Sequence, residues 1–168
     1  KTVVTGSAIT PSMQKVVVKS AANAPLWGAL YRQYFEEIQQ VTASKGALQV
    51  EKKLFVERNN GQGIELQPVT DGNPLEYVHL KDLRAGCCEP TQQMAGSSYK
   101  DGLWMYHAPE DAAEHFFIHR LPKGTFVLEY AVYTERSGNY SGGISTIQCL
   151  YAPEFVSHTA GSKILVQD

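Results

Sequence analysis

Apolar and polar residues alternate with a period of two along much of the chain, as in strands with one buried face. The alternation is clearest over residues 126–136, where Phe126, Leu128 and Tyr130 share one face. Further strands are predicted at 14–19, 26–35, 48–56, 64–69, 75–83, 115–121, 144–150 and 163–166, with a short extended piece at 104–106. A helix competes over residues 29–41, because the apolar spacing there partly fits a 3.6-residue period. We favour a strand up to residue 35, then a turn or short helix at 36–38.

Turn-forming residues separate these strands. Clusters of Gly, Pro, Asn and Asp occur at 59–63, 71–74, 122–125 and 137–139, and the first predicts a hairpin turn. Residues 88–101 are predicted to form a long loop that is most flexible at 94–98, and 109–114 a single helical turn that begins at Pro109. Short strands at this spacing predict an all-β fold, an antiparallel immunoglobulin-like β-sandwich with a long loop and at most one short helix.

Composition and charge narrow the possible partners. Hydrophobic residues make up 43% of the 168 residues, which is enough for a core, and the formal net charge is −2. A weakly acidic chain with scattered basic residues lacks the charge expected of a nucleic-acid-binding protein. No apolar run is long enough to span a bilayer, and no signal peptide is recognisable. Since the first residue is Lys1, we expect a mature product or an excised fragment whose targeting signals lie upstream.

The three cysteines do not predict a disulfide framework or a catalytic thiol. One bridge between Cys149 and either Cys87 or Cys88 is possible in an oxidising compartment, but small buried or half-buried thiols are the favoured interpretation. His79 or His107 could serve as a base for Cys87 or Cys88, yet no nucleophile signature surrounds either cysteine.

Other candidate chemistry is also better explained by structure. On a helix, His115 and His119 would form a metal-ligand pair, but their apolar surroundings predict a strand on which they share a face more widely spaced. Nothing in the sequence places the acidic pairs Asp82/Glu89 and Asp111/Glu114 across a cleft, and no phosphate-binding glycine motif occurs. The sequence therefore predicts no catalytic residue, no cofactor and no metal site, and a protein that is not an enzyme.

Aromatic residues supply the candidate contact surface. Tyr99, Trp104 and Tyr106 flank the predicted loop and are the best candidates for an exposed patch, although aromatic residues are first of all core residues. The segment 151–155 contains a proline, which predicts a corner that closes the sandwich; a docking surface is the functional alternative. The candidate interdomain or partner contacts are Tyr99, Trp104, Tyr106, Tyr151, Pro153, Glu154 and Phe155.

Three stretches resemble the C-terminal macroglobulin-type domain of the bacterial alpha-2-macroglobulin family. They are Tyr-Val-His-Leu-Lys-Asp-Leu-Arg-Ala at 77–85, the run from Phe-Phe to Leu-Glu-Tyr at 116–130, and Ile-Ser-Thr-Ile-Gln-Cys-Leu-Tyr-Ala-Pro-Glu-Phe at 144–155. Residues 24–36 look like the strand that leads out of the preceding domain in that family. The resemblance implies that residues 1–41 form this strand segment, packed on the sandwich, and that 42–168 form the C-terminal macroglobulin-like β-sandwich.

The resemblance implies a large parent protein similar to eukaryotic protease traps. This chain would be a non-catalytic module of an endopeptidase inhibitor of the cell envelope, in the periplasm or on the outer surface. It would dock against neighbouring domains of the parent and meet proteases only indirectly, with no nucleic acid and no membrane contact. The alternative is a stand-alone immunoglobulin-like binding module for glycan or surface protein, which would use the loop between Cys88 and Tyr106.

The chain departs from the family pattern in two places. A strand beginning Val-Gly-Asp, expected just before residues 75–77, does not occur, so it is either deleted or missing from this sequence. A deletion would leave a sheet edge open. The thioester motif is also absent, because Cys88-Glu89-Pro90 lacks the glutamine, and this chain cannot form the thioester.

Overall fold

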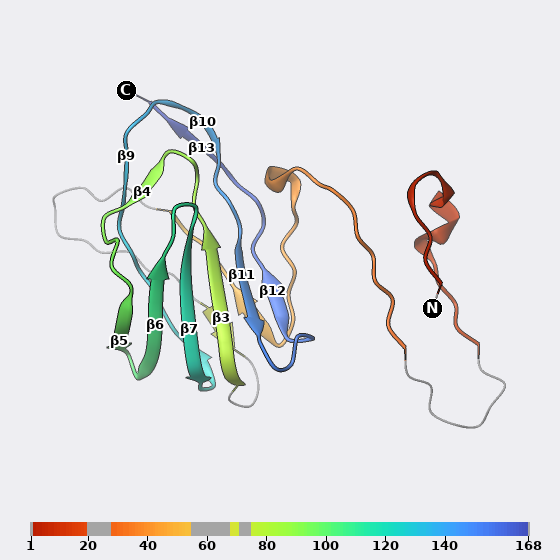
Figure 1. The fold of residues 1–168 in the computed structure, drawn as a ribbon, viewed down its shortest axis with the longest axis horizontal. Coiled ribbons are helices and arrows are strands. Elements are labelled where there is room, and N and C mark those ends of the chain that lie inside the picture. The colour runs from red at the N-terminus through yellow and green to blue at the C-terminus, as the bar shows by residue number, and fades with distance from the viewer. Residues whose placement is uncertain (1, 20–27, 55–67, 71–74, 168) are drawn as a thin grey trace. The chain divides into compact units, whose positions relative to one another are not determined.

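The computed structural model describes residues 2–19, 28–54, 68–70 and 75–167, and the fold is drawn in Figure 1. The chain divides into two compact units, Lys1–Tyr34 and Phe35–Asp168. Among the described residues the only helices are short 3₁₀ helices, and no helix is long and apolar enough to cross a membrane.

The first unit contains two 3₁₀ helices, η1 (Gly6–Ala8) and η2 (Pro11–Gln14), and no strand in its described part. The strand predicted at 14–19 is therefore wrong: Gln14 ends η2, and residues 15–19 form no strand, with Val16, Val17 and Val18 exposed. The strand predicted at 26–35 is likewise absent from 28–35, and residues 26 and 27 lie outside the described residues. β-Branched composition favours extended backbone, but a strand also needs a neighbour to accept its hydrogen bonds.

The second unit is built on a six-stranded antiparallel sheet in the order β12-β11-β3-β7-β6-β5 (Figure 1). The two central strands, β3 (Leu75–Leu83) and β7 (Ala113–Leu121), are the longest and pair with each other. The remaining strands of this sheet are β5 (Gly96–Lys100), β6 (Leu103–Pro109), β11 (Ser145–Cys149) and β12 (Val156–His158).

Smaller sheets complete the second unit. A three-stranded sheet has the order β1-β2-β8, and two two-stranded sheets pair β4 with β9 and β10 with β13. These strands are β1 (Leu48–Val50), β2 (Pro68–Thr70), β4 (Cys88–Pro90), β8 (Gly124–Thr125), β9 (Val132–Thr134), β10 (Gly138–Ser141) and β13 (Lys163–Val166). All the pairings are antiparallel, so the predicted all-β antiparallel sandwich is confirmed.

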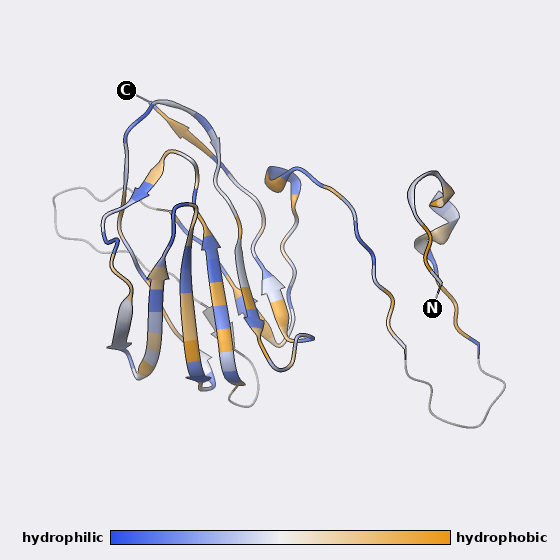
Figure 2. Ribbon diagram, in the orientation of Figure 1, coloured by the Kyte–Doolittle hydropathy of each residue, from blue (hydrophilic) through white to orange (hydrophobic). Residues whose placement is uncertain are grey.

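The hydrophobic core lies on one face of the six-stranded sheet, because alternate side chains of a strand point to the same side. Bands of orange and blue alternate along β3 and β6 in Figure 2. Leu48 and Leu128, from segments outside this sheet, cover the apolar side chains. The buried core residues are Leu48, Val78, Leu80, Leu103, Met105, Phe116, Ile118, Leu121, Leu128 and Ile147. Burying each large side chain contributes about 1.5–3 kcal/mol.

The segment that precedes β1 is held beside β12 by backbone contacts. The 3₁₀ helix η3 (Ile38–Gln40) starts this segment, and Ser44 forms an isolated bridge with His158. The Gly161 N–H donates to the Val41 carbonyl at 2.9 Å. A Cβ at Gly161 would lie 1.8 Å from the Ile38 carbonyl oxygen, so this approach requires a glycine.

The predicted strand at 126–136 is wrong in its first half. Residues 126–131 have no assigned strand, and β9 covers only Val132–Thr134. The alternation nevertheless places Phe126, Leu128 and Tyr130 correctly, since all three pack at the core. One-sided packing produces this pattern even where the backbone joins no ladder.

The predicted long loop at 88–101 is also wrong, because it contains β4 and β5. Strand β5 occupies most of the segment predicted to be flexible and pairs with β6. Its sequence, Gly-Ser-Ser-Tyr-Lys, has little apolar alternation, so backbone pairing rather than a buried face defines it. The helical turn predicted at 109–114 is instead the tight turn between β6 and β7, where the Glu110 N–H donates to the Ala113 carbonyl at 2.8 Å.

Of the remaining predicted strands and turns, some agree with the structure and others lie outside the described residues. Strand β3 matches the predicted 75–83, and β13 matches 163–166. Strands β1 and β2 pair, as the predicted hairpin requires, but its turn at 59–63 and the turn at 71–74 lie outside the described residues. Strand β12 follows the predicted corner and was not expected. Cys87, Cys88 and Cys149 are free and buried, as predicted for structural thiols.

Candidate functional site

The face of the six-stranded sheet opposite the core carries a group of exposed aromatic side chains. Tyr99 on β5 and Trp104 on β6 are directly opposite in the ladder, 61% and 62% exposed, with ring centroids 5.5 Å apart. Tyr106, two residues along β6, pairs with Phe117 of β7 at 6.5 Å between centroids. Because the spacing of a strand is regular, these side chains stand on one surface rather than on a loop.

The group continues across the two central strands. Phe117 stacks on His79 of β3 with centroids 4.5 Å apart, and Tyr77 meets His119 edge-on at 4.8 Å. Tyr77 also meets Tyr151, from the turn after β11, at 4.8 Å. We call this surface the outer aromatic face, formed by Tyr77, Tyr99, Trp104, Tyr106, Phe117 and Tyr151.

The structure thus brings together four of the seven candidate contact residues and separates the other three. Tyr99, Trp104, Tyr106 and Tyr151 belong to the outer aromatic face. Pro153 and Glu154 are exposed in the turn between β11 and β12. Phe155 packs against the core, while its carbonyl accepts from the Cys149 N–H at 3.0 Å.

Tyr77, a residue of the outer aromatic face, has an unusual backbone conformation. Its φ is 55°, a left-handed value that non-glycine residues rarely adopt. The ladder between β3 and β7 skips this residue, passing from Glu76 opposite Arg120 to Val78 opposite Ile118. The Tyr77 carbonyl accepts from the Leu150 N–H at 2.9 Å, which fixes the turn that carries Tyr151.

Two histidines form a hydrogen-bonded pair beside the aromatic rings. His79 Nε2 lies 2.9 Å from His115 Nδ1, and the two rings lie within 14° of parallel. Burial lowers the pKa of His79, and the neighbouring His115 and Lys81 lower it further. His115 and His119 lie on one strand as predicted, but the neighbour of His115 comes from β3. No sequence signal identifies that neighbour, because it lies 36 residues away.

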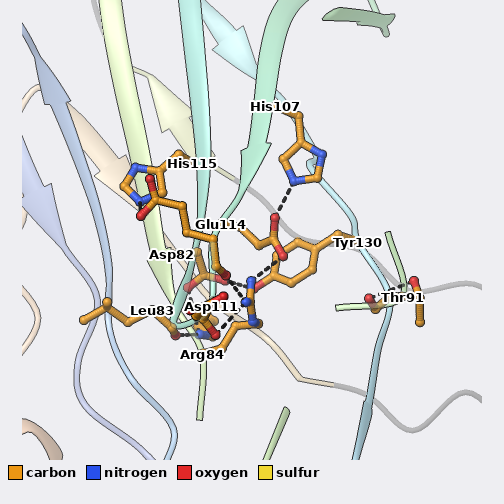
Figure 3. A network of polar contacts seen from close by, with 12 residues as sticks. Asp82, Leu83, Arg84, Thr91, His107, Asp111, Glu114, His115 and Tyr130 are labelled. Atoms are coloured by element: carbon orange, nitrogen blue, oxygen red, sulfur yellow. Dashed lines mark hydrogen bonds and ion pairs between the residues drawn. The ribbon is translucent and has the colours of Figure 1, made fainter. Parts of the chain in front are cut away.

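The inner face holds a buried ionic group between β6, β7 and the end of β3 (Figure 3). The Arg84 guanidinium donates to one oxygen of the Glu114 carboxylate, and His107 Nε2 contacts the other. Arg84 also donates to the carbonyls of Glu110 and Asp111, the second at 2.9 Å. The Glu114 side chain is only 1% exposed, so its charge depends on these partners.

A second buried group surrounds Asp82 on β3. Lys52 Nζ lies 2.7 Å from Asp82 Oδ1, and Ser145 Oγ donates to the same oxygen at 2.7 Å. The Tyr130 hydroxyl donates to Asp82 Oδ2. Burial raises the pKa of Tyr130, and the Asp82 charge raises it further, so the phenol stays a donor.

A cavity of about 240 Å³ opens beside these groups. Its polar lining includes His107, Glu114 and Glu129, together with Ser97 and Ser98. The carboxylates are already paired, Glu114 with Arg84 and Glu129 with Lys100 at 2.9 Å. Sequence reasoning considered Glu114 only as half of an acidic pair with Asp111, yet its partners are Arg84 and His107.

Neither histidine considered as a base for Cys87 or Cys88 contacts a cysteine. His107 contacts Glu114 and His79 contacts His115. Cys88 is buried beside Cys87, and burial raises the pKa of its thiol to about 11, which keeps it protonated at neutral pH. Within the described residues, no group of three or more His, Cys, Asp and Glu side chains could hold a metal ion.

Comparison with known proteins gives one match. No curated protein and no solved structure matches the chain. The family model of the bacterial alpha-2-macroglobulin MG10 domain matches residues 32–154, which is nearly three quarters of the chain. A macroglobulin-type domain is a non-catalytic type of module, and the antiparallel sheets agree with it. The chain belongs to the bacterial alpha-2-macroglobulin MG10 domain family.

Proposed function

We propose that this chain is a non-catalytic, C-terminal module of an alpha-2-macroglobulin-like endopeptidase inhibitor in the cell envelope, and that it docks against neighbouring domains of its parent. In such a trap, a protease cuts a bait segment and is then enclosed by the rest of the protein. The present module contributes contacts between domains, and any thioester lies elsewhere in the parent.

The outer aromatic face is the observation that carries this proposal. Trp104, Tyr99 and Tyr151 are each more than 60% exposed, although large aromatic side chains are normally buried. Contiguous apolar patches of this kind mark interaction surfaces, and Tyr and Trp are enriched at the centre of interfaces. The face stands on paired strands, so its side chains are held in place before any partner arrives.

The inner face supports a structural rather than a catalytic role. Its charged groups contact one another and backbone carbonyls, which leaves no carboxylate of the network unpaired for acid–base work. The thiol with the raised pKa is a poor nucleophile at neutral pH.

The proposal is tested first on the size and chemistry of the native gene product. We expect a mass several times the 18.6 kDa of this chain. Uptake of one methylamine would show a working thioester in the parent, whereas no uptake would leave a trap without covalent chemistry. A product near 18.6 kDa would overturn the intramolecular role.

A variant pair then tests the surface itself. We expect Trp104→Ser with Tyr106→Ser, introduced into the full-length product, to reduce the fraction of protease that becomes trapped after bait cleavage. Leu165→Ser is the matched control, because Leu165 is 61% exposed on β13 and lies outside the outer aromatic face. Equal trapping by both variants would contradict docking through this face.

A glycan-binding module is the second candidate, favoured by the exposed Tyr99–Trp104 pair. Sugars stack on flat aromatic platforms, but these two rings are tilted by 48° and the Tyr106–Phe117 pair by 43°. The rings therefore offer no single plane. Titration of the 168-residue chain with cell-envelope glycan fragments, followed by tryptophan fluorescence, would support this candidate if Trp104→Ser abolished a saturable change.

A further inference from the structure

Two histidines on the central strands of the sheet support the outer aromatic face. His79 on β3 and His115 on β7 occupy diagonal positions of the ladder, and His79 Nε2 lies 2.9 Å from His115 Nδ1. Phe117 stacks on His79, with ring centroids 4.5 Å apart and planes within 5° of parallel. Tyr106 in turn packs against Phe117. The position of the His79 ring therefore affects where the aromatic rings of the face stand.

The hydrogen bond between the two histidines depends on the number of protons that they carry. Two imidazole rings have four nitrogens, and the bond needs a proton on one facing nitrogen and a lone pair on the other. A neutral pair carries two protons and a pair with one positive charge carries three, so both can keep the bond. A doubly charged pair carries four protons. Both facing nitrogens are then donors, and the bond is lost.

A single carboxylate stands ready to balance one positive charge. Glu110, in the turn between β6 and β7, has its Oε2 3.4 Å from His115 Nε2, the nitrogen that faces away from His79. That nitrogen is buried and has no hydrogen-bond partner among the described residues. Because the Glu110 side chain is 68% exposed, it can approach a charged His115. The surroundings therefore accommodate the first added proton.

The other neighbours oppose a second charge or leave it unbalanced. Burial lowers the pKa of His79, and the neighbouring His115 and Lys81 lower it further. Lys81 is also opposite His115 in the ladder. The adjacent strands place uncharged residues opposite the two rings, Gln148 of β11 at His79 and Ala108 of β6 at the other ring. The second proton therefore enters at a lower pH than the first.

We propose that the His79–His115 pair makes the outer aromatic face sensitive to acid, because the pair keeps its hydrogen bond with one added proton and breaks it with two. Two like charges at facing nitrogens repel, so His79 then moves away from His115 and from its stack on Phe117. The consequence for the parent rests on the proposed docking function: contact with the neighbouring domain weakens as the pH falls.

The first test is an NMR titration of the histidines in the wild-type 168-residue chain from pH 8 to pH 4. We expect the pair to take up its two protons in separate steps, about one pH unit or more apart. The ring signals of Phe117 should stay constant through the first step and shift with the second. Simultaneous uptake of both protons, or a second step that leaves Phe117 unmoved, would overturn the proposal. No variant is needed for this measurement.

A matched pair of variants then assigns the two steps. In His115→Gln, His79 should titrate in a single step, at a higher pH than the second step of the wild type, because the His115 charge no longer opposes it. His119→Gln is the control, since His119 lies on the same strand but contacts Tyr77. Both steps should persist in this control. A two-step titration that survives in His115→Gln would contradict the coupling of the pair.

Trapping by the full-length product tests the consequence for docking. The protease should cut the bait equally at pH 7.5 and at a pH below the second step. At the lower pH, the wild type and His119→Gln should trap a smaller fraction, and His115→Gln should lose less. Equal losses in all three would overturn control of docking by the pair. Failure of docking itself gives a different result, because Trp104→Ser with Tyr106→Ser would then trap as well as Leu165→Ser at pH 7.5.

Discussion

The two faces of the six-stranded sheet are built from the same strands but differ in what their side chains meet. Along β6, Leu103 is 1% exposed and the next residue, Trp104, is 62% exposed. Along β7, Phe116 is buried in the core while Phe117 stands on the outer aromatic face. Both faces are rich in apolar side chains, so hydrophobicity alone does not distinguish core from surface in this chain.

The two faces differ in how completely their side chains are covered or paired by other residues. On the inner face, even the Glu114 carboxylate is enclosed, because Arg84 and His107 contact its two oxygens. On the outer face, Trp104 and Tyr99 touch each other but remain open. The inner face therefore stabilises the fold, and the outer face is free to meet a partner. The following predictions test that division.

Breaking the inner ion pair should have the largest effect. Arg84→Met leaves the Glu114 charge buried with only His107 beside it, and we expect the free energy of unfolding to fall by about 3–5 kcal/mol. Urea denaturation of the 168-residue chain measures this loss. The double variant Arg84→Met/Glu114→Gln should recover much of it, because the unpaired charge is gone. A double variant no more stable than the single one would contradict this cause.

Neighbouring residues of β6 offer the most direct comparison of the two faces. Leu103→Ala should lower the free energy of unfolding by about 2–5 kcal/mol, since it removes buried methyl groups and leaves a cavity. Trp104→Ala removes a larger side chain yet should change stability by less than about 1 kcal/mol. Thermal unfolding of both variants checks the contrast. Equal losses would mean that the outer face is part of the core.

Alkaline pH should lower the free energy of unfolding by a smaller amount, through the buried Cys88 thiol. The pKa of Cys88 is raised from 9.0 to about 11, so the folded chain keeps a proton that the unfolded chain loses. This contribution is fully present below about pH 9 and is lost as pH rises towards 11, amounting to no more than about 2–3 kcal/mol. The raised pKa of Tyr130 acts in the same direction. Between pH 8 and pH 10.5, Cys88→Ala should lose less stability than the wild type, and an equal loss would assign the effect elsewhere.

The exposed ion pair should have the smallest effect. Lys100 and Glu129 lie 2.9 Å apart with side chains 45% and 44% exposed. We expect Lys100→Met to change the free energy of unfolding by less than about 1 kcal/mol, with the difference vanishing at high salt. A cost close to that of Arg84→Met would remove the distinction between enclosed and exposed charges.

Sequence reasoning succeeded where a strand has one buried face. The pattern at 75–83 predicts β3 at its observed ends, because Val78, Leu80 and Asp82 all point inward. It failed for β5 and β12, which are short and are defined by backbone bonds to β6 and β11. It also predicted strands at 14–19 and 26–35 from composition, and the described residues of both segments form no ladder. Pairing depends on a partner elsewhere in the chain, and local composition does not reveal it.

The outer aromatic face includes residues that sequence proximity does not group together. Tyr99, Trp104 and Tyr106 were grouped because they are close in sequence. The addition of Tyr77 and Phe117 depends on the register of β3, β6 and β7, which the sequence does not specify. The histidines show the same limit, since His115 was compared with its sequence neighbour His119 rather than with His79.

Strand β5 has a consequence for handling the module outside its parent. It ends the six-stranded sheet, and no described strand pairs with its far side. Within the described part of the chain, the backbone donors and acceptors along this edge have no strand partner, which favours pairing with a second copy of the chain. The strand is only five residues long and finishes at Lys100, a residue type that discourages such pairing. We expect concentrated preparations to form soluble, reversible oligomers through this edge before any fibrous aggregate, and Ser98→Pro to shift them back to monomer.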